Sequence, residues 1–326
     1  MTDAASGAPA PAQFPDESED GAFVRQDDAF RDWVRADGST PYPPEAGRYQ
    51  LYVSYACPWA HRTVIVRALM GLEDALGMTV VNPIRDEAGW RFGGAPGLEP
   101  DPIEGFTYLA TAYAATDPEY DGRVTVPVLW DTQTHRIVSN SDDDIMRMLE
   151  TEFGALARRD ADLYPREHRA EIEQLNAWLY ERFNNGVYRA GFATTQREYE
   201  RAVLEVFATL DRLEARLAER RYLLGNRPLE SDWRAFVTLV RFDPVYVGHF
   251  KCNLRRIVDY PNLWGYLRDL YQIPGIAATV NFDHIKRHYY MTHDEINPAR
   301  IVPLGPLLDF EAPHDRARLA SFDRLP

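Results

Sequence analysis

The residue best suited to covalent chemistry is Cys57, one of only two cysteines in the chain of 326 residues. Residues 48–56 before it are rich in aromatic and β-branched side chains, which predicts a strand. Pro58 follows, and apolar residues then recur at helical spacing, so a helix is expected to begin directly after the cysteine. A sulfur at that position meets free backbone amides and the positive end of the helix dipole. We therefore predict that Cys57 is a nucleophile with a lowered pKa rather than a buried structural cysteine.

Alanine occupies the position at which a dithiol oxidoreductase carries its second cysteine, because the segment reads Cys57-Pro58-Trp59-Ala60. A mixed disulfide at Cys57 then has to be resolved by an external thiol, for which cellular glutathione is the candidate. The other cysteine, Cys252, is expected to be a helix residue packed in or near the core. A resolving role for Cys252 is the alternative.

Pro127 lies in the segment TVPV of residues 125–128, where it opens a strand expected beside the cysteine. A cis bond before this proline would leave the amide of Val126 free to pair with the backbone of a bound peptide. A proline at the first position of an edge strand is the other interpretation. Together with Cys57, the motif predicts that Val126 and Pro127 bind glutathione, which is such a peptide.

The elements that would position these residues follow a thioredoxin-like order. Strands are expected at residues 78–84, 124–131 and 135–140, the last two joined as a hairpin, and a helix follows from residue 141. With the strand and helix around the cysteine, the order is β, α, β, loop, β, β, α. The Gly- and Pro-rich residues 86–122 form a long insertion, and such loops are often functional.

From about residue 163 the sequence predicts long amphipathic helices and no strands. These helices are expected at residues 167–183, 198–221, 232–246, 263–271 and 275–288. The predicted fold is an α/β N-terminal thioredoxin-like domain followed by an all-α C-terminal domain. The expected parts are a disordered lead-in (1–22), a thioredoxin-like domain that binds glutathione (23–155), an all-helical substrate domain (160–295) and an extended C-terminal tail (296–326).

Composition excludes several classes of function. The formal net charge of −14 would repel a nucleic-acid backbone. No apolar run approaches the length of a membrane span, and residues 1–21 lack the features of a secretory signal. Two cysteines are too few for a disulfide framework, and His284 and His288 fit a solvated or hydrogen-bonded pair better than a metal site. We expect a soluble, cytoplasmic protein without nucleic acid, membrane, metal or a tightly bound cofactor.

Several segments resemble the Xi class of glutathione transferases, the glutathionyl-hydroquinone reductases. The matching segments are YVSYACPWAHRT (52–63), VTVPVLWD (124–131), NNGVYRAGFATTQ (184–196), TLVRFDPVYVGHFKCN (238–253), FDHIKRHYYMTH (282–293) and INPARIVPLGP (296–306). With the isolated Trp90 they cover nearly the whole chain after Phe23. The CPxA motif alone suggests only an omega-like transferase, and the helical segments and the tail make the resemblance more specific.

The resemblance implies a glutathione transferase fold, a homodimer and glutathione as co-substrate, with a glutathionylated aromatic substrate. It also assigns roles to residues beyond the nucleophile. Trp90 and the backbone of Val126 would hold glutathione. Tyr188, Tyr246 and Tyr289 would line the hydroquinone pocket.

Tyr188 and Tyr289 are also expected to be catalytic together with Cys57. An aryl carbanion is a very poor leaving group, so the ring carbon that bears sulfur has to be protonated. Tyrosines that hydrogen-bond the ring hydroxyls and steer this proton meet that need. Arg123, directly before a predicted strand, would pair with a glutathione carboxylate or be a solvated loop arginine.

The sequence departs from the family's pattern in two places. The pair that receives the γ-glutamyl carboxylate is usually Glu-Ser, whereas here it reads Ser141-Asp142. The Ser141 hydroxyl and helix amides are expected to bind that carboxylate, which Asp142 would repel unless it is turned away. The second departure is Leu229, which replaces a helix-capping serine before a buried aspartate. Ser231 or Glu230 is expected to cap the helix instead.

The function we predict is glutathione-dependent reduction of glutathionyl-hydroquinones through a Cys57 mixed disulfide, with release of oxidised glutathione. An omega-like thioltransferase or dehydroascorbate reductase would use the same cysteine on other substrates. A non-catalytic, transferase-like assembly module is an alternative of another class. A cysteine at the start of a helix argues against that module, which needs no nucleophile.

Overall fold

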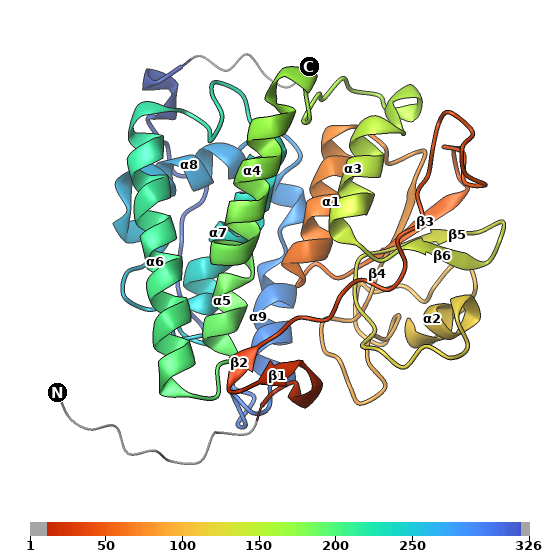
Figure 1. Ribbon diagram of the computed structural model, residues 1–326, viewed down its shortest axis with the longest axis horizontal. Helices are drawn as coiled ribbons and strands as arrows, with labels where there is room; N and C mark the ends of the chain where they lie inside the picture. The colour runs from red at the N-terminus through yellow and green to blue at the C-terminus, as the bar shows by residue number, and fades with distance from the viewer. Residues whose placement is uncertain (1–11, 321–326) are drawn as a thin grey trace.

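The chain folds into two domains, described over residues 12–320 by a computed structural model (Figure 1). The first domain contains a four-stranded sheet. Its strands are β3 (Tyr49–Val53), β4 (Gly77–Val80), β5 (Val128–Asp131) and β6 (Arg136–Ser139), in the order β4-β3-β5-β6. β3 runs parallel to β4 and antiparallel to β5, which is antiparallel to β6. This sheet confirms the predicted thioredoxin-like fold.

The central strand β3 is buried along its whole length, which explains why its sequence does not alternate between polar and apolar residues. Its one polar residue, Gln50, donates a hydrogen bond to the Thr79 hydroxyl of β4 at 2.6 Å. The strand ends at Val53, opposite Val80 of β4. Cys57 therefore lies just beyond the edge of the sheet, at the carboxyl end of a rigid strand.

Helices cover both faces of the sheet (Figure 1). α1 (Pro58–Leu69) and α3 (Asp142–Thr151) pack together on the face toward the second domain, and α2 (Ala110–Thr116) contacts β6 on the other face. The sequence pattern does not predict α2, which lies within the insertion at residues 86–122. The insertion is thus partly helical rather than a plain loop.

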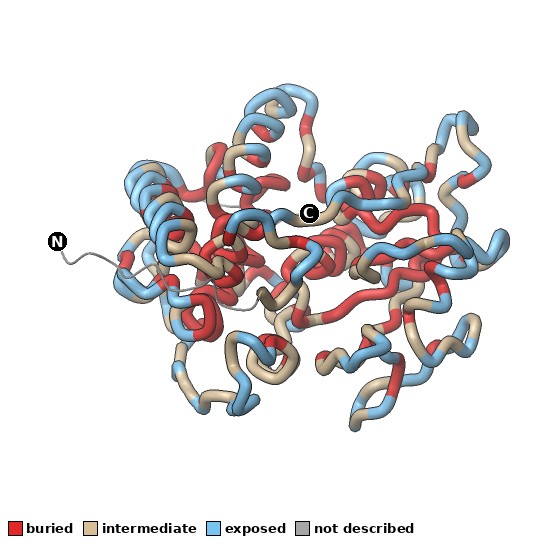
Figure 2. Tube along the Cα trace, turned by 60° about the horizontal axis from the view of Figure 1, so that its bottom comes forward, coloured by how far each residue is buried: buried red, intermediate tan, exposed pale blue. Residues whose placement is uncertain are grey.

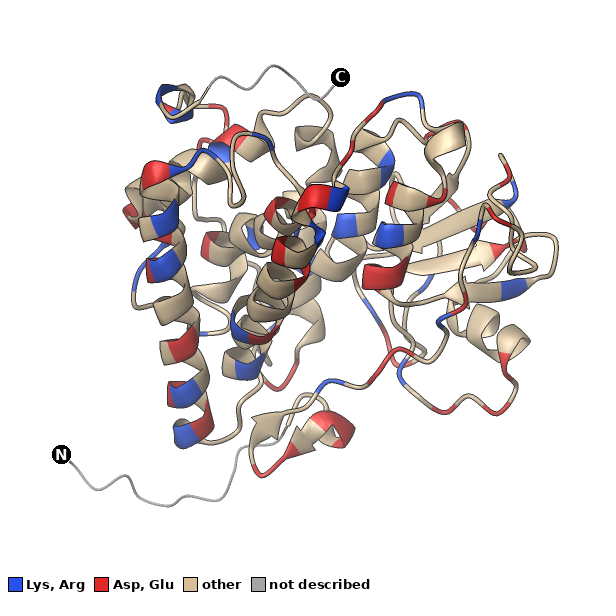
Figure 3. Ribbon diagram, turned by 45° about the horizontal axis from the view of Figure 1, so that its top comes forward, with Lys and Arg blue, Asp and Glu red and all other residues tan. Residues whose placement is uncertain are grey.

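The second domain is all-helical, as predicted. Its helices are α4 (Arg169–Leu179), α5 (Gly186–Gly191), α6 (Gln196–Glu219), α7 (Glu230–Arg241), α8 (Pro261–Tyr271) and α9 (Phe282–Thr292). α4 and α7 each continue into a short π-helix, at Tyr180–Asn184 and Phe242–Tyr246. Charged residues of α6 lie along its outer face (Figure 3), and its apolar residues other than the exposed Leu204 are mostly buried against the domain.

Two details of the predicted helices are wrong. The helix expected at residues 275–288 begins only at Phe282, because the Asn281 side chain caps α9 by accepting the His284 amide at 2.9 Å. Ala277–Thr279 form a separate 3₁₀ turn, and Val280 after it is extended, with φ −99° and ψ 117°, so the helix is not continuous with α9. Cys252 is buried, but it lies in coil rather than in a helix.

The start of α7 is capped by a different residue from the two that were expected. The Asp232 carboxylate accepts the amide of Leu229 at 2.8 Å, and it also accepts the amide of Leu223 and the hydroxyl of Tyr266. Ser231 and Glu230 instead bond to other helices. Burial raises the pKa of Asp232 to about 6, against the effect of these three donors.

The expectation of a disordered lead-in at residues 1–22 is wrong for its second half. Residues 1–11 lie outside the described part of the chain. From residue 12 onward the chain forms a 3₁₀ turn and then a hairpin of β1 (Ser18–Glu19) and β2 (Ala22–Phe23). The hairpin lies against the helical domain near α5 (Figure 1).

The tail at residues 296–326 is described as far as residue 320 and is mostly coil with one 3₁₀ turn. Two of its side chains anchor it. Phe310 stacks on Tyr271 of α8, with ring centroids 4.9 Å apart. Arg316 is fully buried and donates to the carbonyl oxygens of Leu217 and Arg221.

A continuous core joins the two domains (Figure 2). α1 packs on α7 across the interface. Ion pairs cross it as well, since Arg147 pairs with Glu230 at 2.7 Å and Arg234 pairs with Asp143. Within residues 12–320, no helix is long and apolar enough to cross a membrane.

Candidate active site

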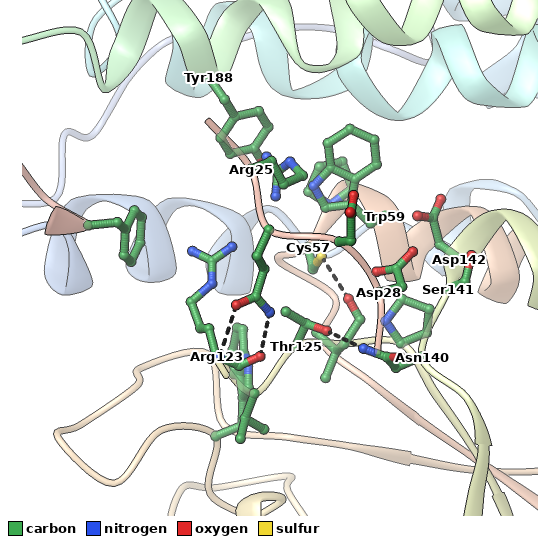
Figure 4. Close-up of a pocket in the computed structure, with 18 of the residues that line it drawn as sticks. Arg25, Asp28, Cys57, Trp59, Arg123, Thr125, Asn140, Ser141, Asp142 and Tyr188 are labelled. Carbon is green, nitrogen blue, oxygen red and sulfur yellow. Dashed lines mark hydrogen bonds between the residues drawn. The ribbon is translucent and has the colours of Figure 1, made fainter. Parts of the chain in front are cut away.

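A cavity of about 520 Å³ lies between the two domains, with Cys57 in its wall (Figure 4). The predicted site residues that line it are Cys57, Trp90, Arg123, Val126, Pro127, Ser141, Asp142, Tyr188 and Tyr289. Tyr246 does not reach the cavity wall and is fully buried behind Tyr289. In the described part of the chain, no cluster of three or more His, Cys, Asp or Glu side chains is arranged to hold a metal ion.

Cys57 is the N-cap residue of α1, and Pro58 is the first helical residue, as predicted. The predicted direction of its pKa is wrong. Burial raises the pKa of the thiol, and this effect outweighs the Ala60 amide, the Arg241 guanidinium and the Trp59 amide, which all favour the thiolate. The helix position helps ionisation, but the desolvation of a sulfur between two packed domains is the larger effect.

The segment that contains Val126 and Pro127 lies beside the sulfur. The bond between Val126 and Pro127 is cis, as expected from the motif, and the Val126 carbonyl lies 3.5 Å from Cys57 Sγ. Among residues 12–320, none accepts a hydrogen bond from the Val126 amide. The neighbouring Thr125 is fixed by the hydroxyl of Tyr113, which donates to its carbonyl at 2.9 Å. A bound peptide can therefore meet a rigid edge with a free donor.

Trp90 is buried in the cavity wall rather than exposed on its glycine-rich loop. Its ring stacks on His288, with centroids 5.0 Å apart, and the guanidinium of Arg85 lies 5.4 Å from its centroid. His288 Nδ1 is 2.7 Å from the Pro83 carbonyl, so this nitrogen carries the proton and donates. His288 does not pair with His284. The role of Trp90 in binding glutathione stays a prediction.

Positive charge gathers on one side of the cavity. Arg123 is not a solvated loop arginine, because its Nη1 pairs with Glu17 at 2.8 Å and Gln26 forms two hydrogen bonds with its backbone. Arg85 has no carboxylate partner among the described residues, and its buried Nε lacks an acceptor. Burial lowers the pKa of Arg85 to about 10, which leaves it charged at neutral pH. Arg25 lies over the rings of Trp59 and Tyr188.

Negative charge gathers on the opposite side, where Figure 4 shows Asp28, Ser141 and Asp142 together. The Ser141 hydroxyl caps α3 by accepting the Asp144 amide at 3.3 Å. Asp142 pairs with the buried Arg62 at 2.7 Å. Burial raises the pKa of Asp28 to about 6 and that of Asp142 to about 7. The cavity thus presents opposite charges at its two sides, with the cysteine between them.

Two tyrosine hydroxyls meet at the helical side of the cavity. The hydroxyls of Tyr188 and Tyr289 share a short hydrogen bond, and Tyr246 lies behind them with its hydroxyl 3.2 Å from that of Tyr289. Burial raises the pKa of all three, so each is a protonated donor at neutral pH. This chain of hydroxyls can donate a proton into the cavity and replace it from behind.

The N-terminal segment contributes residues to the cavity that were not predicted from the sequence. Arg25, Gln26, Asp27, Asp28 and Arg31 all line the cavity. Their partners are distant in sequence, since Arg25 donates to Asn185, 160 positions away, and Gln26 bonds to Arg123, 97 positions away. Nothing in the local sequence distinguishes these residues from a solvated loop.

A thioredoxin-like domain with a cysteine at the start of its first helix, packed on an all-helical domain, defines the glutathione transferase class of folds. Two family models match the chain accordingly. They are "Glutathione S-transferase, N-terminal domain" over residues 56–152 and "Glutathione S-transferase, C-terminal domain" over residues 196–269. The chain belongs to the glutathione transferase family, in its Xi class.

The similar proteins support this class. The chain is 51% identical to glutathionyl-hydroquinone reductase YqjG of Escherichia coli K12, over 93% of this chain and 94% of that one. The structure of a Xi-class transferase from Natrialba magadii has a TM-score of 0.88 and 52% identity, and the match covers 89% of both chains. The glutathione-bound structure of YqjG has a TM-score of 0.86 and 52% identity, covering 88% of this chain and 96% of that one.

Proposed function

We propose that this protein is a glutathione-dependent reductase that removes glutathione from glutathionyl-hydroquinones, with Cys57 as the nucleophile. The observation that best supports the proposal is that three reactive or binding groups line one cavity. It combines the Cys57 sulfur, the free amide of Val126 and the paired hydroxyls of Tyr188 and Tyr289. The reductase name of the E. coli relative and its structure with bound glutathione support the same activity.

Glutathione is proposed to lie along the backbone edge at Val126, where its cysteinyl sulfur meets Cys57. The γ-glutamyl ammonium would face Asp28 and Asp142, on the negative side of the cavity. The glycine carboxylate would face Arg85, which has no acidic partner in the described part of the chain. Since the Ser141 hydroxyl already caps α3, the amides at the start of α3 would receive the γ-glutamyl carboxylate. A zwitterionic peptide fits such a cavity better than a singly charged ligand does.

The first step moves glutathione from the aromatic ring to the enzyme. The ring carbon that bears sulfur takes a proton from the tyrosine pair while a ring hydroxyl gives its proton back to that pair, which gives a neutral keto tautomer. The Cys57 thiolate attacks the sulfur, the carbon–sulfur bond breaks, and its electron pair restores the aromatic ring as a phenolate. The hydroxyls of Tyr188 and Tyr289 stabilise the ring oxygen during this change.

The second step regenerates the cysteine. A second glutathione thiolate attacks the glutathione sulfur of the mixed disulfide, and Cys57 leaves as a thiolate. Across both steps, two glutathione sulfurs are oxidised to a disulfide and the aromatic product gains the two electrons. No other oxidant or reductant is needed.

The test is whether Cys57 carries glutathione and whether hydroquinone is released. After incubation with glutathione disulfide, intact mass should show one glutathione on the wild type and on Cys252→Ser, and none on Cys57→Ser. Hydroquinone should then appear from a glutathionyl-hydroquinone in the presence of glutathione. An adduct without hydroquinone release would favour an omega-like thioltransferase, and absence of the adduct would favour an assembly module.

We also propose, as the family resemblance implies, that the protein is a homodimer in the cytoplasm. Sedimentation of the purified protein should give the mass of two chains of 37.4 kDa. A single-chain mass at assay concentration would contradict the dimer without affecting the proposed chemistry.

A further inference from the structure

Arg241, the last residue of α7, reaches across the domain interface to the loop that leads into Cys57. Its side chain is fully buried. Nε donates to the Ala56 carbonyl at 2.9 Å, and Nη2 donates to the Tyr55 carbonyl at 2.9 Å. Nη1 lies 3.0 Å from Nδ1 of His61, in the first turn of α1. One guanidinium thus holds the backbone before the cysteine and the helix after it.

The protonation of His61 follows from its two contacts. The Thr279 hydroxyl donates to the Ile276 carbonyl at 2.7 Å, so it accepts from His61 Nε2, which lies 2.8 Å away. Burial lowers the pKa of His61 well below its usual value, so the ring is neutral. Nδ1 is therefore the free acceptor for Arg241. The contact is a normal hydrogen bond rather than a repulsion between two cations.

The charge of Arg241 has no carboxylate partner within residues 12–320. Its four hydrogen bonds in this part of the chain are to carbonyl oxygens and to neutral His61, and they include one to the Val237 carbonyl at 2.8 Å. Arg234, also buried on α7, is by contrast paired with Glu230 and Asp143. A buried cation without a counter-ion stabilises an anion formed near it, and the Cys57 thiol is a neighbour that can ionise.

We propose that Arg241 is a positioning residue for Cys57, whose fork of donors fixes the loop before the sulfur and whose charge supports the thiolate. This inference rests on the proposed role of Cys57 as the nucleophile. It explains how a thiol whose burial disfavours ionisation is kept reactive. Arg85 and Arg123 also favour the thiolate, and Asp142 disfavours it. Arg241 differs from these groups because it also holds the loop before the sulfur, and its own contacts are all to neutral acceptors.

The effect of the Arg241 charge on the ionisation of Cys57 is tested by alkylating Cys57 with iodoacetamide across a range of pH. The experiment uses a Cys252→Ser background and no glutathione. An opposite charge nearby shifts a pKa by about 1 to 3 units. Arg241→Gln should raise the pH midpoint by about one unit or more, which makes alkylation about tenfold slower below both midpoints. Arg241→Lys, which keeps the charge, should stay near the wild type.

The matched control is Arg316→Gln. Arg316 is equally buried and also donates to backbone carbonyls, but it binds the end of α6 and not the cysteine loop. It should lower the thermal unfolding temperature without moving the alkylation midpoint of Cys57. A shift in this control equal to that of Arg241→Gln would reduce the role of Arg241 to general stability and overturn the proposal.

The role of the paired guanidinium donors is tested by measuring the turnover of Arg241→Lys. This variant can also be used if Arg241→Gln does not fold. A lysine cannot donate to both carbonyls in one geometry. Its kcat should fall about tenfold or more through loss of alignment, while KM for glutathione stays within about twofold. Wild-type kcat in this variant would overturn the positioning role, and equal alkylation midpoints for Lys and Gln would overturn the electrostatic one. Because alkylation needs no substrate, a failure of the reductase proposal is seen separately.

Discussion

Replacing Tyr289 by phenylalanine should separate the reaction on the aromatic ring from the reaction on a disulfide. The ring stays in the cavity wall and only the hydroxyl is lost. That hydroxyl is bonded to Tyr188 on the cavity side and lies 3.2 Å from the hydroxyl of Tyr246 behind it. Since Tyr246 is fully buried, its hydroxyl loses a partner that water cannot replace. The expected loss in the free energy of unfolding is about 1 to 2 kcal/mol.

The loss of activity should be larger and selective. Removal of one positioned proton-transfer group costs a factor of roughly a hundred or more, which corresponds to about 3 kcal/mol in the activation barrier. This factor applies to glutathionyl-hydroquinone, whose carbon–sulfur bond needs ring protonation. A mixed disulfide already has a thiolate as leaving group, so its reduction through Cys57 should change by less than about threefold.

The assay compares kcat/KM for the two substrates in Tyr289→Phe and in Tyr290→Phe. Tyr290 is the next residue of α9, but its hydroxyl donates to the Pro244 carbonyl outside the cavity. Its variant should leave the ratio of the two activities unchanged. An equal loss on both substrates in Tyr289→Phe would contradict a role in ring protonation, because the hydroxyl would then serve the fold or glutathione binding.

Three further outcomes are expected. Cys57→Ser should keep its thermal transition, since serine still caps α1, but should lose the glutathione adduct and all turnover. KM for glutathione should rise as the pH falls through 7 and then 6. Burial has raised the pKa values of Asp142 and Asp28 to about these values, so each carboxyl loses the negative charge that attracts the ammonium as it takes a proton. Asp28→Asn should flatten the lower part of that profile, and a profile as steep as wild type would exclude Asp28 from the subsite. Arg85→Gln should raise KM for glutathione about tenfold with kcat unchanged, and unchanged steady-state parameters would show that the glycine carboxylate lies elsewhere.

Local patterns in the sequence predicted the parts of the site that local structure determines. A buried strand, then Cys57, then Pro58 is enough to specify an N-cap at the edge of a sheet. Residue types within a few positions likewise indicated the cis bond before Pro127 in the TVPV segment. The apolar repeat of α6 predicted a helix because one face of it must be buried.

The wrong or missing predictions concern features that depend on contacts between residues far apart in the sequence. The pKa of Cys57 depends on how closely the helical domain covers the sulfur, which the residues around it do not encode. Tyr246 and Tyr289 look alike in sequence, and only packing shows that one lies behind the other. Arg25 and Asp28 belong to the site because their partners come from remote parts of the chain, so no periodicity points to them.

The position of the N-terminal segment has a consequence for the order in which the site is completed during synthesis. Phe14 lies in the cavity wall and contacts Phe192 and His293, and the amide of Glu295 donates to Gln13 at 3.0 Å. Gln13 therefore leaves the ribosome 282 residues before its partner Glu295. The thioredoxin-like domain is able to begin folding earlier, since domains generally fold as units as they emerge. A nascent chain then carries a folded cysteine site that stays open on one side, and it acquires a closed cavity only when α9 has been made.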